Sequence, residues 1–132
     1  MADLMPELRG EIESKPRLYE GMFIVDINRV GTDDRSVKRV VHGLLEKHGA
    51  KVLVSTRWAE REFCYPIKKQ TRGIYHLVYF ECKPEKIADI KRDCYLSGDI
   101  LRVIMLRVKK VPDKVALPDG GWLELDKEAT TI

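Results

Sequence analysis

The stretch from Trp58 to Tyr75 reads WAEREFCYPIKKQTRGIY and decides how the rest of the chain is interpreted. Residues that favour β-strands lie on both sides of a polar turn at residues 68–72, which Gly73 follows. This arrangement predicts one long β-hairpin. Its aromatic rings and positive charges would share a rigid ribbon, and a polyanion with stacking bases is the partner that uses both. The hairpin therefore indicates a module that binds nucleic acid.

Two amphipathic helices and two further strands flank this hairpin. The first helix is predicted between a cap at Thr32 or Asp33 and a stop at Gly49. Its apolar residues recur at helical spacing, and they are Val37, Val40, Val41, Leu44 and Leu45. Pro84 suits the first position of a second helix that continues to about Leu96. Strands are predicted at residues 18–26, 51–67, 74–82 and 100–108.

The resulting order β-α-β-β-α-β defines the fold class. Two right-handed crossovers place both helices on one face of a four-stranded antiparallel sheet, an α+β arrangement of the ferredoxin-like kind. No helix remains for the opposite face, yet the strand period of two brings apolar side chains there. These side chains belong to Met22, Ile24, Ile104 and Leu106. Because contiguous exposed apolar groups usually mark an interface, we expect another polypeptide to cover them.

Length and charge limit the chain to one compact domain with local basic clusters. The chain has 132 residues, of which 44% are apolar, which is enough for one core. The domain is expected over residues 18–108, between an irregular N-terminal extension (1–17) and a flexible C-terminal tail (109–132). Since 24 basic and 21 acidic residues leave a net charge of only +3, any binding of nucleic acid must come from local clustering.

The cysteine pattern and the absence of targeting signals suit a protein of the cytoplasm. Cys64, Cys82 and Cys94 form no C-x-x-C pair, which argues against a disulfide framework or a zinc site. Cys64 and Cys82 are expected to be small buried hydrophobic residues. The sequence has no apolar run near the ~20 residues of a membrane span. Residues 1–17 also lack the apolar segment of a secretory signal.

Basic residues on the hairpin and the last strand are the candidates for RNA contact. They are Arg57, Arg61, Lys68, Lys69, Arg72 and Arg107. The lysine pair is the strongest candidate for phosphate contact, because a protruding turn can reach into a groove or junction. The same charges could instead be solvated residues that keep an edge strand from aggregating. Glu60 and Glu62 flank Arg61 and could pair across strands, which would weaken its attraction for RNA.

The quoted segment, with several residues outside it, resembles the bacterial small-subunit ribosomal protein six family over residues 18–108. The matching residues are Tyr19-Glu20, Gly49-Ala50, Trp58, Arg61, Tyr65-Pro-Ile-Lys-Lys69, Gly73, Tyr75 and Ile100-Leu-Arg102. The resemblance implies a structural protein of the small ribosomal subunit. Such a protein contacts the central domain of the 16S-type rRNA and pairs with small-subunit ribosomal protein eighteen. In the family the C-terminal tail tends to lie along that partner.

We expect the partner protein to dock on the uncovered sheet face and the adjoining strand edge. The expected contacts are Met22, Ile24, Trp58, Arg102, Ile104 and Leu106. Trp58 is more often a packing residue than a platform for bases. Arg102 lies beside apolar neighbours on the predicted face, a setting typical of interface arginines.

Residues 72–80 also resemble the third strand of the RNA-recognition motif, but the fit fails at the positions that stack bases. Ile74 and His76 stand where that motif has aromatic side chains, and Tyr75 replaces a small residue. Recognition of RNA shape and backbone is therefore expected, rather than reading of single-stranded bases.

Enzymatic function has little support in the sequence. His42, His48 and His76 are scattered without ligand-like spacing, and no nucleophile-elbow or Walker-type motif is present. We expect no metal, cofactor or small-molecule substrate and no membrane contact. The alternative reading is a self-associating ferredoxin-like domain with a regulatory or small-molecule-binding role. An acylphosphatase-like enzyme is a distant third, since no glycine-rich phosphate loop follows the first strand.

Overall fold

The computed structural model describes residues 15–125, so most of the expected N-terminal extension and residues 126–132 of the tail lie outside it. The main sheet consists of β1 (Arg17–Asp26), β2 (Lys51–Ile67), β3 (Gln70–Cys82) and β4 (Ile100–Arg107). The helices are α2 (Ile27–Val30), α3 (Asp34–Glu46) and α4 (Ile87–Ser97), and a 3-10 turn at Pro84–Lys86 precedes α4. A short pair of strands, β5 (Lys114–Ala116) and β6 (Trp122–Glu124), follows β4.

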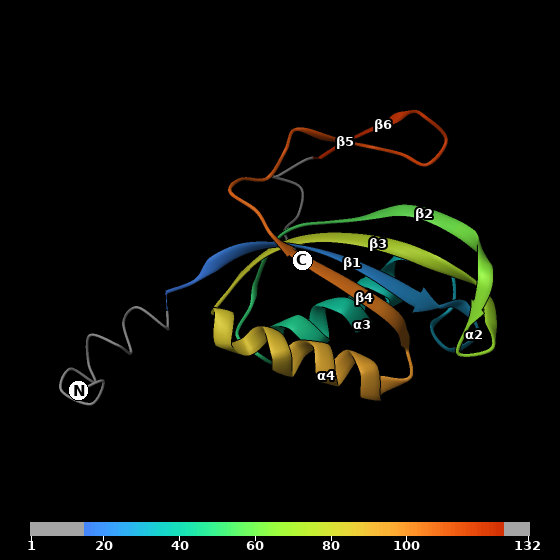
Figure 1. Ribbon diagram of the computed structural model, residues 1–132, viewed down its shortest axis with the longest axis horizontal. Helices are drawn as coiled ribbons and strands as arrows, with labels where there is room; N and C mark the ends of the chain where they lie inside the picture. The colour runs from blue at the N-terminus through green and yellow to red at the C-terminus, as the bar shows by residue number, and fades with distance from the viewer. Residues whose placement is uncertain (1–14, 126–132) are drawn as a thin grey trace.

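The sheet is antiparallel and has the strand order β2-β3-β1-β4. Figure 1 shows α3 and α4 together on one face of it, below the strands in that view. This arrangement confirms the α+β, ferredoxin-like prediction. It also makes β2 and β4 the two edge strands of the sheet.

The core between helices and sheet follows from the two sequence periods. Phe23 and Val25, two residues apart on β1, are fully buried on the helix side. Val37, Val41 and Leu45 of α3 are buried against them, at a spacing that keeps all three on one helix face. The sequence left Thr32 and Asp33 as alternatives for the N-cap of α3. The N-cap is Asp33, whose carboxylate accepts a hydrogen bond from the Ser36 backbone N–H at 3.0 Å.

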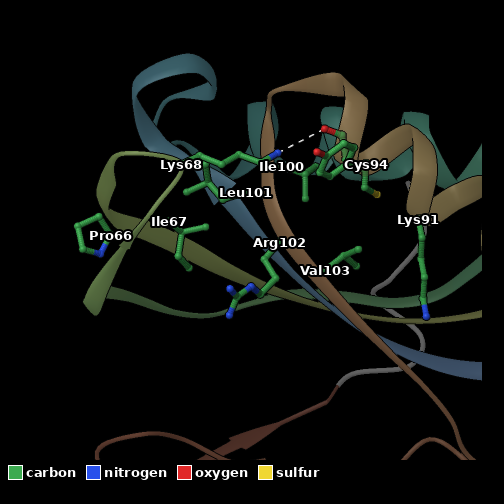
Figure 2. A pocket seen from close by; sticks show the side chains of 10 residues that line it. Pro66, Ile67, Lys68, Lys91, Cys94, Ile100, Leu101, Arg102 and Val103 are labelled. Atoms are coloured by element: carbon green, nitrogen blue, oxygen red, sulfur yellow. Dashed lines mark hydrogen bonds between the residues drawn. The ribbon is translucent and has the colours of Figure 1, made fainter.

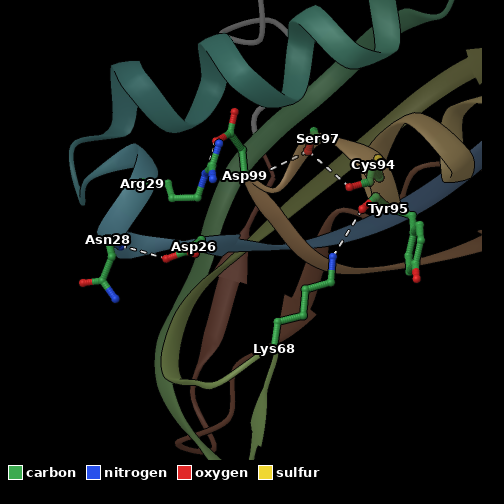
Figure 3. A network of polar contacts seen from close by, with 8 residues as sticks. All are labelled: Asp26, Asn28, Arg29, Lys68, Cys94, Tyr95, Ser97 and Asp99. Carbon is green, nitrogen blue, oxygen red and sulfur yellow. Dashed lines mark hydrogen bonds and ion pairs between the residues drawn. The ribbon is translucent and has the colours of Figure 1, made fainter.

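Helix α2 is an element that the sequence analysis did not include. It is a single turn that begins after Asp26, whose carboxylate accepts a hydrogen bond from the Asn28 backbone N–H at 2.9 Å. Arg29 of this turn forms an ion pair with Asp99 at 3.0 Å, just before β4 begins. Figure 3 shows these contacts at the end of the sheet where β1 stops. A turn so short leaves no periodic pattern that sequence reasoning can detect.

The prediction of a flexible tail is wrong for residues 114–125. Strands β5 and β6 form a hairpin on the sheet face opposite α3 and α4, above the strands in Figure 1. Val115, Leu123 and Leu125 belong to one apolar cluster with side chains of β2 and β3, namely Val54, Leu77 and Tyr79. The face without helices is therefore partly covered by the chain itself, because the hairpin places alternate apolar residues on its inner side.

The distal part of the β2–β3 hairpin, residues 61–72, extends beyond the rest of the sheet, and we call it the arm. Its tip is a turn of two residues, Lys68 and Lys69, both with positive φ (49° and 68°). The turn is therefore shorter than the predicted turn at 68–72, and β3 already begins at Gln70. The side-chain amide of Asn28 donates a hydrogen bond to Gln70, which ties the arm to α2.

Candidate nucleic-acid and protein interface

Arg72, one of the six basic candidates, is held inside the arm by two carboxylates. Its guanidinium donates to Glu60 at 2.8 Å and to Glu62 at 3.2 Å. The register explains the pairing, because Glu62 lies directly opposite Arg72 on the neighbouring strand. The two carboxylates thus flank Arg61 in sequence but pair with Arg72. The hydrogen bond to Glu60 and the nearby charges raise the pKa of Arg72 above its usual value.

Two further candidates lie away from the arm. The guanidinium of Arg57 donates to the Thr32 backbone carbonyl, in the loop that precedes α3. Arg107 is exposed at the last position of β4, whose first residues lie beside the arm. Arg107 lies five positions along the strand from Arg102, which corresponds to about 17 Å. The six predicted RNA contacts therefore do not form one patch.

The tip of the arm presents its two lysines differently. The Lys68 ammonium donates to the Tyr95 backbone carbonyl at 3.3 Å and lies 4.9 Å from the centre of the Tyr95 ring, so it is folded back onto α4. The side chain of Lys69 is exposed and, like that of the exposed Arg61, forms no hydrogen bond or ion pair with any residue in the described range 15–125. Lys69 and Arg61 are consequently the arm cations most available to an external phosphate.

Two pockets adjoin the arm and share Pro66, Ile67 and Arg102. The larger, of about 540 Å³, lies between the arm tip, the end of α4 and the start of β4. Figure 2 shows Lys68 reaching over this pocket toward α4, with the side chains of Arg102 and Lys91 along its other side. The smaller, of about 340 Å³, is lined mainly by residues 61–67 of the arm and includes Tyr65, which is 82% exposed.

An apolar strip remains exposed on the sheet face beside the C-terminal hairpin. It consists of the exposed Ile104 and Leu106 together with the partly buried Met22, and we call it the β4 strip. Ile104 lies opposite Met22 in the register of β1 and β4 and is 51% exposed, while Leu106 is 55% exposed. Arg102, on the same side of β4, connects this strip to the two pockets at the arm.

Two residues expected at the partner interface are already covered. Ile24 is only 3% exposed, since a methyl group of its side chain and the ring of Phe63 both lie against Gly73. The indole N–H of Trp58 donates to the Ala116 carbonyl of β5 at 2.8 Å, so the hairpin occupies the polar end of this side chain. The sheet face available to a partner is therefore narrower than the sequence predicts.

A buried polar chain links two histidines that the sequence showed only as scattered. The Ser55 hydroxyl lies 2.7 Å from Nε2 of His42 and 2.7 Å from Nε2 of His76, and all three residues are buried. Burial lowers the pKa of His76 to about 4 and also lowers the pKa of His42. A neutral, enclosed chain of this kind fixes α3 against β2 and β3. It could not have been found from sequence spacing, since three separate elements supply its members.

The remaining chemistry of the described residues is limited. Cys82 is buried as expected, but Cys64 is exposed because it lies in the irregular part of the arm between Glu62 and Ile67. Within residues 15–125 no set of three His, Cys, Asp or Glu side chains is arranged to hold a metal ion. None of the helices in this range has the length and apolar character needed to cross a membrane.

Comparison with known proteins agrees with this geometry. The model of the family described as Ribosomal protein S6 matches residues 18–107. Relatives named small ribosomal subunit protein bS6 occur in Rhodopirellula baltica (30% identity over 72% of this chain and 68% of that protein) and Corynebacterium aurimucosum (37%, 69% and 95%). The relative in Gluconacetobacter diazotrophicus is 36% identical, and the match covers 73% of this chain and 60% of that longer protein.

A solved structure shows the same fold. The crystal structure of 30S ribosomal protein S6 from Thermotoga maritima superposes with a TM-score of 0.58 at 26% identity, over 71% of this chain and 89% of that one. The chain therefore belongs to the ribosomal protein S6 family, which confirms the resemblance seen in the sequence. It is a ribosomal structural protein and not an enzyme, and its location is the ribosome of the cytoplasm.

Proposed function

We propose that this protein is a constituent of the small ribosomal subunit that binds the central domain of the 16S-type rRNA jointly with small-subunit ribosomal protein eighteen. One observation carries the proposal. The exposed apolar β4 strip lies next to the cationic arm, and Arg102 adjoins both. An apolar patch is suited to a protein partner, and free cations are suited to the phosphate backbone.

Each partner then supplies part of a shared RNA-binding surface. The protein has a net charge of only +3, and Arg57 and Arg72 are occupied by contacts within the chain. Since Lys68 is also bonded within the chain, only three of the six candidate cations remain, namely Arg61, Lys69 and Arg107, so the protein's own affinity for the rRNA junction should be low. Protein eighteen, docked on the β4 strip, would add a second set of contacts at high effective concentration.

The proposal is tested by measuring binding to the isolated central-domain junction with this protein alone, with protein eighteen alone and with both. We expect weak binding by this protein and at least tenfold tighter binding by the pair. If the protein alone binds as tightly as the pair, joint recognition is wrong. A stable homodimer that ignores protein eighteen would instead favour the self-associating regulatory domain.

Salt dependence identifies which cations touch phosphate. Lys69→Gln should lower the slope of log K against log salt by about 0.7 to 0.9 for the paired proteins, the value for one lost phosphate contact. Lys51→Gln is the matched control, because Lys51 is also exposed on the β2–β3 hairpin but lies at its opposite end. An unchanged slope for Lys69→Gln would remove the arm tip from the RNA-binding surface.

A further inference from the structure

The charged residues that line the larger pocket at the arm are all cations. They are Lys68, Lys91 and Arg102, and none of residues 15–125 contributes a carboxylate to the lining. Asp93 and Asp99 are sequence neighbours of the lining residues Cys94 and Ile100, and both carboxylates already have partners. Asp93 pairs with Lys47 and His48, and Asp99 pairs with Arg29. A ligand that carries negative charge therefore meets three cations without a competing carboxylate.

An aromatic ring stands at the border of this pocket. Tyr95, in the last turns of α4, is 73% exposed although its ring lies 4.9 Å from the Lys68 ammonium. The ring is thus in contact with a cation while most of the residue remains accessible. Figure 3 shows the ring projecting from α4 while Lys68 approaches the backbone carbonyl of the same residue. A ring held in this way offers a flat surface for stacking.

The remaining walls are apolar. Ile67 of the arm and Leu101 and Val103 of β4 line the space between the cations. Cys94 adds no charge, because burial raises the pKa of its thiol to about 12 and keeps it protonated at neutral pH. The pocket therefore combines an aromatic platform, an apolar floor and cations at its rim within about 540 Å³.

We propose that this pocket binds one unpaired nucleotide of an RNA strand, with the base against Tyr95 and the flanking phosphates at Lys91 and Arg102. The inference deepens the proposed function, because it rests on RNA as the ligand and adds a site that reads an unstacked base. It departs from the sequence-based expectation of recognition by shape and backbone alone. A base-paired strand cannot use this site, since its bases are stacked and enclosed.

The test is a titration of the full-length protein, followed by amide NMR, with three probes: single-stranded tetrauridylate, an RNA duplex and inorganic phosphate. We expect tetrauridylate to shift the amides of residues 66–68, 91–95 and 100–103 in a saturable way. The duplex should not shift the Tyr95 region. If phosphate alone reproduces the shifts, the site binds anions only and the proposed nucleotide site is wrong.

Matched variants separate stacking from charge. Tyr95→Leu should weaken tetrauridylate binding about tenfold, within the range for loss of one stacked base, while Tyr95→Phe should retain it. Leu96→Ala is the control, because Leu96 is adjacent, 68% exposed and outside the pocket lining. Lys91→Gln should weaken binding more than Arg92→Gln, whose side chain pairs with Asp89 on the same helix. The nucleotide site is wrong if Tyr95→Leu weakens tetrauridylate binding no more than Leu96→Ala does, or if Lys91→Gln weakens it no more than Arg92→Gln does.

The two proposals can fail independently. If tetrauridylate binds the pocket but the protein with protein eighteen does not bind the rRNA junction, the nucleotide site stands and the ribosomal proposal is wrong. If the junction binds normally and Tyr95→Leu changes neither junction nor tetrauridylate binding, the pocket proposal alone is wrong.

Discussion

Gly73 occupies a point where the backbone of β3 passes two side chains at close range. A Cβ atom at this position would lie 2.7 Å from the Phe63 ring and 2.9 Å from a methyl group of Ile24. It would also lie 3.2 Å from the Val25 carbonyl, which cannot move without disturbing β1. The base of the arm is therefore packed around a missing side chain.

Gly73→Ala should lower the free energy of unfolding by about 1 to 3 kcal/mol, because the added methyl group overpacks this junction. Urea denaturation measures the change. Gly43→Ala is the matched control, since a Cβ at Gly43 meets no atom of residues 15–125 within 4 Å and the residue is exposed in the last turn of α3. The control should be neutral or stabilising by up to about 1 kcal/mol. Equal destabilisation by both variants would contradict the packing argument.

The buried histidine chain makes stability depend on pH. Among residues 15–125, Nδ1 of His76 is the one buried side-chain nitrogen or oxygen without a hydrogen-bond partner. A lone pair costs less to leave unsatisfied than an N–H, so His76 should carry its proton on Nε2 and donate to Ser55. Protonation of Nδ1 would place a charge in this enclosed site, and burial therefore lowers the pKa of His76 to about 4.

The sign of the effect follows from the two states. The unfolded chain binds a proton near pH 6.5, whereas the folded chain does so only near pH 4, so His76 supports the fold above pH 6.5 and its contribution is lost as pH falls toward 4. The loss should amount to about 3 kcal/mol. His76→Gln should make the free energy of unfolding less dependent on pH between pH 4 and pH 6.5, whatever the stability of this variant at neutral pH. An identical profile for both proteins would refute this role.

At the scale of elements, the C-terminal hairpin determines which part of the sheet is free. Strands β5 and β6 have only three residues each and, among the strands of residues 15–125, no sheet neighbours except each other. Such a pair is marginal by itself, so it depends on the apolar cluster with Val54, Leu77 and Tyr79 and on the Trp58 hydrogen bond. The hairpin should therefore be held by the sheet as one unit.

The two tryptophans report this docking directly. The Trp58 indole N–H is bonded to Ala116, whereas the Trp122 side chain is 60% exposed on the hairpin. We expect slow hydrogen exchange at the Trp58 indole and fast exchange at that of Trp122, as measured by NMR. Truncation after residue 112 should make the Trp58 indole exchange fast while the core amides of β1 stay protected. Fast exchange at Trp58 in the intact protein would show that the hairpin is not docked.

At the scale of the whole molecule, the three layers separate stability from recognition. Helices α3 and α4 cover one sheet face, the C-terminal hairpin covers part of the other, and the β4 strip remains between the hairpin and the open edge of the sheet. Ile104 and Leu106 of this strip contribute little to the core because they are about half exposed. Changes there should affect association more than folding.

The double variant Ile104→Ser with Leu106→Ser should lower the free energy of unfolding by no more than about 1 kcal/mol, as expected for half-exposed positions. Its affinity for protein eighteen should fall at least tenfold, because the apolar contact area is lost. Calorimetric titration measures this affinity. Leu96→Ser is the control, since Leu96 is also an exposed apolar residue but lies on α4, on the other side of the sheet. Unchanged affinity in the double variant would place the partner elsewhere.

Local sequence patterns were sufficient to predict the fold of the main sheet and its helices. The period of α3, the alternation along β1 and β4 and the order of elements led to the correct fold, because each depends on neighbours in sequence. The placement of Arg102, Ile104 and Leu106 on the face without helices was also predicted from alternation alone. The polar, glycine-containing composition of residues 109–125 concealed the β5–β6 hairpin, since its apolar residues gain stability only against a sheet formed elsewhere.

The family, the element order and the existence of an apolar sheet face could all be predicted from the amino-acid sequence, since local periodicity and a specific motif are properties of adjacent residues. Which polar and charged side chains are free could be read only from the folded chain. It paired Arg72 with Glu60 and Glu62, placed Lys68 on α4 and covered Trp58 with the hairpin. Each of these contacts joins residues ten or more positions apart, and their geometry depends on strand register and on how the arm curves, which no local pattern encodes.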